Sequence, residues 1–134
     1  VIDACYRGAL APGSNAKLTT LRNYKFSICF ENTQFPGYIT EKIFDCFFAG
    51  CIPIYLGAPD IHQFVPKESF VDFSEFGAYE ELERFLVSLS DAEAGLYLQA
   101  AQDFIRSERF DRFHVIDHVQ RILRSVGEVA ARYA

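Results

Sequence analysis

The stretch YKFSICFENTQFPGYITEKIFDCFFAGCIPIYLG, residues 24–57, alternates patterns typical of strands and of a helix. The apolar run 26–30 predicts a strand, and a second apolar run, 52–56, predicts another. Between them, residues 41–49 carry apolar side chains at helical spacing: Ile43, Phe44, Phe47 and Phe48. Gly50 is expected to end that helix. Strand, helix, strand with continuously apolar strands predicts an α/β fold, with a parallel sheet covered by helices on both faces.

Polar residues follow the first of these strands. Residues 31–33, Glu-Asn-Thr, come where a parallel strand delivers side chains to a ligand crevice. Thr40 is expected to cap the next helix, whose free N–H groups would then favour an anion beside Glu41 and Lys42. A carboxylate that accepts ribose hydroxyls next to an amine that neutralises phosphate is the chemistry that a nucleotide requires. The pattern therefore predicts a nucleotide-binding site, and the helix pattern alone leaves open the alternative that Glu41 and Lys42 are an ordinary solvated first turn.

The segments that flank this stretch extend the α/β pattern. Residues 1–5 are expected to form a short strand, residues 8–15 a loop, and residues 18–24 a helical turn. A turn begins at Gly57, and residues 70–73 predict a further short strand.

Beyond residue 78 the pattern becomes helical. An apolar stripe predicts one helix from Tyr79, through the positions Leu82, Phe85, Leu86 and Leu89. Ser90 with Glu93 forms a capping-box pattern that starts a second helix reaching Ile105. A third helix is expected over residues 111–132.

Composition restricts the class of protein. The chain has 134 residues, half of them hydrophobic, which fits one domain with a sizeable core. Its net charge of −5 argues against nucleic acid as a partner. No run approaches the roughly 20 apolar residues that cross a bilayer, and no signal sequence is visible, so we expect a soluble chain that is not transmembrane. The absence of methionine and the start at Val1 suggest a piece of a longer protein.

The four cysteines, Cys5, Cys29, Cys46 and Cys51, lack the paired close spacing of a zinc site. We expect small buried thiols in a reducing compartment rather than a disulfide framework. The three histidines, His62, His114 and His118, have no partner carboxylate or cysteine at ligand spacing, and no metal site is predicted. The aromatic residues Tyr24, Phe26, Phe44, Phe47 and Phe48 are interpreted as packing residues rather than a platform for a base.

Several motifs in one order resemble a known family. FENT, YITEK, AGCIPIYLG and FVPKESFVDF are similar to the C-terminal sugar-nucleotide signature of the α-1,3-fucosyltransferases, glycosyltransferase family 10. The resemblance covers roughly residues 1–124. It implies the C-terminal, Rossmann-like half of a two-domain GT-B enzyme, with residues 1–134 forming the GDP-fucose-binding domain and the acceptor domain absent from this chain.

The resemblance also assigns roles. The family residues at the positions of Tyr38, Glu41 and Lys42 contact the donor nucleotide, and the residue at Asn32 lies close to it. Glu31 and Thr40 would support the site, and the sequence leaves open whether Glu31 touches substrate or only braces the loop. The family places the catalytic base and a diphosphate-binding arginine upstream, so no catalytic residue is expected here, and the isolated chain is expected not to transfer fucose.

The resemblance implies GDP-fucose as donor and a glycan acceptor, either N-acetyllactosamine-like or a lipopolysaccharide antigen. No Asp-x-Asp pair occurs, so we expect neither a metal nor another cofactor in donor binding. The Golgi members' cysteine pair near the C-terminus is missing, which favours a bacterial cytoplasmic source, with the full-length protein peripheral to the inner membrane, over a eukaryotic Golgi one. One alternative stays open, a non-catalytic nucleotide-sugar-binding or interaction module of the same fold. A response-regulator domain is excluded because no acidic cluster is seen at the strand ends.

Overall fold

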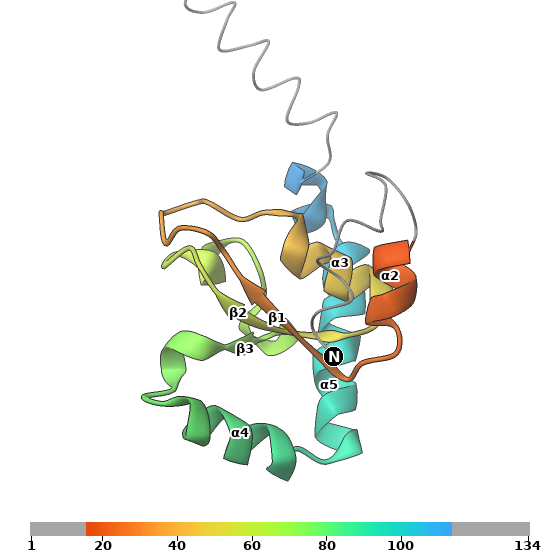
Figure 1. Ribbon diagram of the computed structural model, residues 1–134. Coiled ribbons are helices and arrows are strands. Elements are labelled where there is room, and N and C mark those ends of the chain that lie inside the picture. Colours follow the sequence, from red (N-terminus) through yellow and green to blue (C-terminus); the bar gives the residue numbers. More distant parts are fainter. Residues whose placement is uncertain (1–15, 114–134) are drawn as a thin grey trace, which may run out of the picture.

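The computed structural model describes residues 16–113, which fold around a small parallel sheet (Figure 1). The strands are β1 (Phe26–Phe30), β2 (Ile52–Leu56) and β3 (Val71–Asp72), in the order β1-β2-β3. β1 and β2 pair over their full length, from Phe26 opposite Ile52 to Phe30 opposite Leu56. Because all described strands run parallel, their carboxyl ends meet at one edge, where a ligand crevice is expected. The α/β prediction is confirmed.

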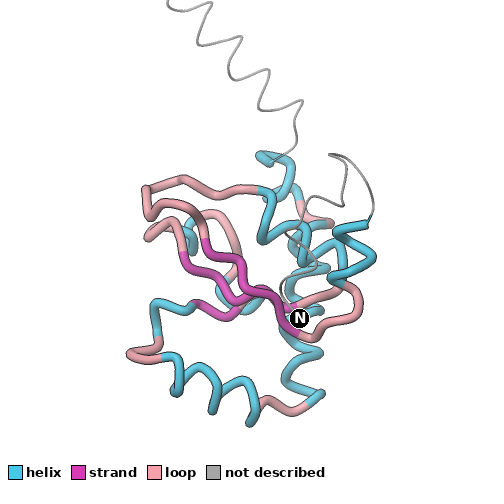
Figure 2. Tube along the Cα trace, viewed as in Figure 1, coloured by secondary structure: helices cyan, strands magenta, loops and turns pink. Residues whose placement is uncertain are grey.

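Helices connect and cover the strands. The α-helices are α2 (Ala16–Leu21), α3 (Glu41–Ala49), α4 (Tyr79–Ser88) and α5 (Asp91–Ile105). Short 3₁₀ turns complete the described chain: η1 (Ile61–Gln63), η2 (Lys67–Ser69), η3 (Phe73–Glu75) and η4 (Glu108–Phe113). Figure 2 shows the strands between the α2 and α3 helices on one side and α4 on the other. The predicted helices on both faces are therefore present.

Each face of the sheet has its own core. On one face, α3 buries Ile43, Phe44 and Phe47 against Cys29 and Tyr55. On the other, α4 contributes Leu82, which packs with Ile52, Ile54, Val71 and the α5 residue Ala94. Successive residues of a strand point to opposite faces, which is why β1 and β2 supply both cores. α5 joins the two cores, since its Ala101 and Phe104 belong to the first.

Two helix ends were predicted correctly from local signals. Gly50 ends α3 in the left-handed conformation, with φ of 72°, and its N–H and that of Cys51 bond back to the last turn. Ser90 and Glu93 form the complete capping box at the start of α5. Both signals act between residues a few positions apart, so they do not depend on the rest of the fold.

Other expectations were wrong in extent. β1 is an edge strand of the described sheet, and Ile28 is 57% exposed although the run 26–30 is continuously apolar. The strand expected over residues 70–73 is only Val71–Asp72, because Phe73 already begins η3. The helical turn expected over residues 18–24 is α2, which begins and ends earlier. Phe48, interpreted as a packing residue, does pack edge-on against Phe110 but is 48% exposed.

Three predicted elements fall wholly or partly outside the described residues. The strand over residues 1–5 and the loop over 8–15 lie outside. Of the helix expected over 111–132, only residues 111–113 are described, and they belong to the 3₁₀ turn η4.

Candidate donor-binding site

A buried carboxylate organises the carboxyl end of β1. The Glu31 side chain has no exposed surface, and its two oxygens accept hydrogen bonds from Thr40 and Lys42. Thr40 donates its backbone N–H at 2.8 Å and its hydroxyl at 2.9 Å to Oε1. Lys42 donates its Nζ at 2.9 Å to Oε2. A buried charge needs such partners to offset lost hydration, and here they tie the strand end to the start of α3.

Thr40 does not cap α3 as predicted. It occupies the N-cap position, but its side chain makes no hydrogen bond to the first turn and instead donates to Glu31. The Glu31 carboxylate is charged and therefore a strong acceptor for the Thr40 hydroxyl. It reaches Thr40 from across the loop, a contact that the sequence pattern could not predict. The consequence is that the Thr40 hydroxyl leaves the first-turn N–H groups of α3 to other acceptors.

Glu41 and Lys42 have different partners although they are adjacent. Lys42 is 22% exposed at its side chain and pairs with Glu31. The Glu41 carboxylate is 68% exposed and lies 3.8 Å from Lys17 of α2. Burial alone lowers the pKa of Lys17, but its hydrogen bond with Asp45, 2.6 Å away, and the charges of Asp45 and Glu41 raise that pKa above its usual value. Successive helical residues differ by about 100° in direction, which explains the divergence.

The remaining predicted site residues lie on the loop between β1 and α3. Asn32 is exposed, and Tyr38 is 39% exposed. The structure therefore brings together Glu31, Thr40 and Lys42, and leaves Asn32, Tyr38 and Glu41 as exposed side chains around them.

Two further residues, not predicted from the sequence, shape this edge. Gly57, directly after β2, packs so closely that an added Cβ would lie 2.6 Å from Cγ of Glu31. Asp60 accepts a hydrogen bond at 2.8 Å from the backbone N–H of Gly37 in the site loop. The Gly-Ala-Pro-Asp sequence after the strand was an available signal, but it was interpreted only as a turn.

Three thiols lie behind the site. Cys29, Cys46 and Cys51 are free and buried, as predicted; Cys5 lies outside the described residues. The sulfurs of Cys29 and Cys46 are 3.3 Å apart, and the Cys29 thiol lies 3.5 Å from the backbone oxygen of Lys42. Contact with Cys46 and burial both raise the pKa of Cys29 and Cys51, which keeps these two thiols protonated.

One histidine has a partner that the sequence analysis did not foresee. His62 Nε2 lies 2.8 Å from Oδ2 of Asp72, and its ring stacks on Phe70. The two residues are ten positions apart and meet because η1 and the end of β3 are adjacent in space. His114 and His118 lie outside the described residues. Within residues 16–113 no group of three or more His, Cys, Asp or Glu side chains could hold a metal ion.

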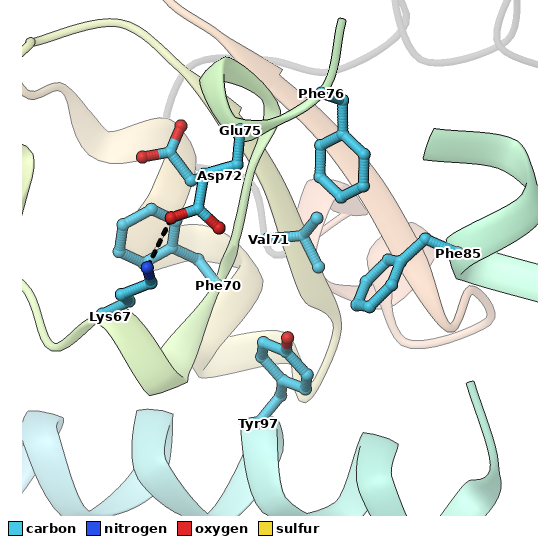
Figure 3. Close-up of a pocket in the computed structure, with 8 residues that line it drawn as sticks. All are labelled: Lys67, Phe70, Val71, Asp72, Glu75, Phe76, Phe85 and Tyr97. Carbon is cyan, nitrogen blue, oxygen red and sulfur yellow. Dashed lines mark hydrogen bonds and ion pairs between the residues drawn. The ribbon is translucent and has the colours of Figure 1, made fainter. Parts of the chain in front are cut away.

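A cavity of about 120 Å³ lies elsewhere, beside β3 (Figure 3). Figure 3 shows Val71 among the rings of Phe76, Phe85 and Tyr97, with the paired side chains of Lys67 and Glu75 at one side. None of the predicted site residues lines it. The cavity is thus separate from the cluster of Glu31, Thr40 and Lys42.

In the described part of the chain, no helix has the length and apolar character needed to span a membrane.

Comparison with known proteins identifies the family. The model of the C-terminal region of glycosyltransferase family 10 (fucosyltransferase) matches residues 1–121. The chain belongs to this family. The family-10 chain is 43% identical over 75 residues to the α-(1,3)-fucosyltransferase FucT of Helicobacter pylori, covering 56% of this chain and 16% of that protein. It is 41% identical over 71 residues to an α-(1,4)-fucosyltransferase of Arabidopsis thaliana, covering 53% of this chain and 18% of that protein.

Solved structures agree with this assignment. A crystal structure of an α1,3-fucosyltransferase with GDP-fucose matches with a TM-score of 0.57 and 36% identity, over 72% of this chain and 28% of that one. A second, with GDP, matches with a TM-score of 0.55 and 38% identity, over 64% of this chain and 25% of that one. In each of these comparisons, the family-10 chain thus spans less than a third of the length of the matched protein.

Proposed function

We propose that this chain supplies the donor-nucleotide site of an inverting α-1,3/4-fucosyltransferase, which transfers fucose from GDP-fucose to a hydroxyl of a glycan. The observation that carries the proposal is the position of Lys42 in a family-10 chain. Lys42 lies in the first turn of α3. Its ammonium is held at the carboxyl end of β1 by buried Glu31, the residue directly after that strand. The two matched crystal structures with GDP-fucose and GDP support this choice of donor.

The chemistry of the donor matches these groups. A diphosphate carries negative charge, which the Lys42 ammonium and the N-terminal N–H groups of α3 can attract together. When the bond between fucose and GDP breaks, negative charge grows on the departing diphosphate. Lys42 would stabilise that charge more strongly in the transition state than in the ground state, which accelerates the reaction. Glu31 keeps the ammonium at the strand end and prevents it from extending into solvent.

Exposed groups around Lys42 complete the proposed contacts. Glu41 has a carboxylate that can accept hydrogen bonds from ribose hydroxyls, and it is largely exposed. Tyr38 would donate its hydroxyl to a phosphate or to the sugar, and Asn32 would lie close to the nucleotide at the end of β1. Donor binding is proposed to need no metal, because the sequence contains no Asp-x-Asp pair and Lys42 provides positive charge.

The rest of the reaction is assigned to another part of the protein. Inverting transfer needs a carboxylate that deprotonates the acceptor hydroxyl on the face opposite the leaving GDP. We place that base, and most acceptor contacts, in an N-terminal domain. The acceptor is proposed to be N-acetyllactosamine-like or a lipopolysaccharide antigen, and the source a bacterial cytoplasm. Relatives from both Helicobacter pylori and Mus musculus match the chain, so a Golgi location is the alternative.

Titration of the ¹⁵N-labelled 134-residue chain with GDP, followed by NMR, tests the donor site. Saturable shifts are expected around residues 31–42, and Lys42→Ala should weaken binding about 10- to 100-fold, the equivalent of one charge-assisted hydrogen bond. The matched control is Lys25→Ala, which removes an equal charge at the opposite end of β1, where Lys25 pairs with Asp91. Affinity for GDP should be unchanged in EDTA.

The possible outcomes separate the two candidate functions. Selective binding of GDP over UDP, lost in Lys42→Ala but not in Lys25→Ala, supports the donor site. Shifts that are absent at millimolar GDP, or equal losses in both variants, would reject it and favour an interaction module. Lys42→Ala also leaves the buried Glu31 carboxylate without its cation. Lys42→Arg retains a positive charge beside Glu31 and is the control for a loss of binding that is caused only by this unpaired carboxylate.

A further inference from the structure

The site loop contains a turn that sets the direction of Tyr38. The backbone N–H of Tyr38 donates to the carbonyl of Phe35 at 3.0 Å, and Gly37 has a φ of +73°. A type II turn has proline at its second position and a glycine with positive φ at its third. The N–H of its fourth residue donates a hydrogen bond to the carbonyl of the first. Tyr38 is the fourth residue, so its position depends on the form of this turn.

Asp60 holds the peptide unit in the middle of that turn. Its Oδ1 accepts from the N–H of Gly37 at 2.8 Å. Asp60 stands at the N-cap of η1, yet its side chain makes no capping bond there and reaches instead to a loop 23 residues earlier. The bonded N–H belongs to the peptide between Pro36 and Gly37, whose orientation distinguishes a type II turn from type I.

The local sequence does not fix that orientation by itself. Pro36 fits the second position of both turn types, and a glycine tolerates positive and negative φ about equally. An acceptor on one side of the turn stabilises the form that points the Gly37 N–H toward it. The carboxylate of Asp60 is such an acceptor and bonds to an N–H more strongly than a neutral group would.

We propose that Asp60 is a positioning residue of the donor site, which keeps the Pro36–Gly37 turn in its type II form and so places the Tyr38 hydroxyl for the nucleotide. This inference rests on the proposed function, which gives Tyr38 a donor contact. Asp60 itself need not touch the donor. Its effect on binding passes through Tyr38, which separates this role from general support of the fold.

A double-mutant cycle on GDP affinity, measured by NMR titration of the 134-residue chain, tests the proposal. Asp60→Ala should weaken binding about three- to tenfold, as expected for a partly exposed hydrogen bond to a charged acceptor. Asp60→Asn keeps a side-chain oxygen and should stay within about twofold of the wild type. In a Tyr38→Phe background, Asp60→Ala should cause no further loss. Asp91→Ala is the control for removing an exposed carboxylate elsewhere.

The Gly37 amide gives a readout that needs no ligand. Without its acceptor, this amide should exchange with solvent faster and its proton resonance should move upfield in Asp60→Ala but not in Asp91→Ala. An unchanged Gly37 amide, a wild-type affinity of Asp60→Ala, or an equal loss in the Tyr38→Phe background would each overturn the proposal. Failure of the wild-type chain to bind GDP would instead reject the donor site itself.

Discussion

Replacing Gly57 with alanine would force a methyl group between two buried side chains. An ideal Cβ at this position lies 2.4 Å from the Tyr55 hydroxyl oxygen and 2.6 Å from Cγ of Glu31. Non-bonded carbon atoms prefer separations of about 3.5–4.0 Å, so the methyl would overlap Glu31 by about 1 Å. Gly57 does not have positive φ, and the conflict therefore comes from packing rather than from backbone conformation.

Neither neighbour can move away without breaking other contacts. Tyr55 is 1% exposed, and its hydroxyl oxygen accepts from the N–H of Ala58 at 3.0 Å. Glu31 is fixed by Thr40 and Lys42. Overpacking costs about 1–3 kcal/mol, and a weakened hydrogen bond adds about 1 kcal/mol. We expect Gly57→Ala to lower the free energy of unfolding by about 2–4 kcal/mol.

Urea denaturation of the 134-residue chain measures this loss, and Gly95→Ala is the matched control. Gly95 lies inside α5, and a Cβ there would meet nothing within 4 Å. Alanine in a helix interior is favoured over glycine by about 0.5–1 kcal/mol, so this second variant should be more stable than the wild type. The same chemical change is thus expected to have opposite signs at the two positions.

A free energy of unfolding of Gly57→Ala within about 0.5 kcal/mol of the wild-type value would refute the described packing, because substitutions at unconstrained surface positions usually fall in that range. A destabilised Gly57→Ala should also show displaced NMR signals at residues 31 and 40–42. If its signals moved elsewhere, the strain would not pass through Glu31.

Two further predictions concern the same buried groups. Glu31→Ala should lower the free energy of unfolding by about 2–4 kcal/mol in urea, because it removes the acceptor of Thr40 and the partner of Lys42; Glu31→Gln keeps an acceptor and should lose less, and equal losses would contradict a role for hydrogen bonding. Burial raises the pKa of Tyr55 to about 12 from its usual 10, so the folded chain holds this proton more tightly than the unfolded one. The Tyr55 proton therefore contributes about 2–3 kcal/mol to the free energy of unfolding below about pH 10, and this contribution is lost as the pH rises to 12. Urea titrations from pH 9 to 12 should show a shallower decline in Tyr55→Phe, and identical slopes would rule the shift out.

The sequence predicted those parts of the fold that depend on neighbouring residues. The apolar runs placed β1 and β2 at their observed bounds, and the capping box placed the start of α5. The family motifs brought Glu31, Thr40 and Lys42 into one candidate site. Such signals are readable because strand alternation, helical spacing and helix ends are governed by residues within a few positions of one another.

What surrounds each side chain was decided only by the tertiary structure. Lys42 pairs with Glu31, eleven positions away, and Thr40 gives its hydroxyl to the same carboxylate and not to its own helix. The contact of Asp60 with Gly37 joins residues 23 positions apart, across the loops that follow two parallel strands. Hydropathy and spacing indicate which face a residue occupies. They contain no information on which distant polar group lies opposite, because that is set by the register of the sheet and the path of the loops.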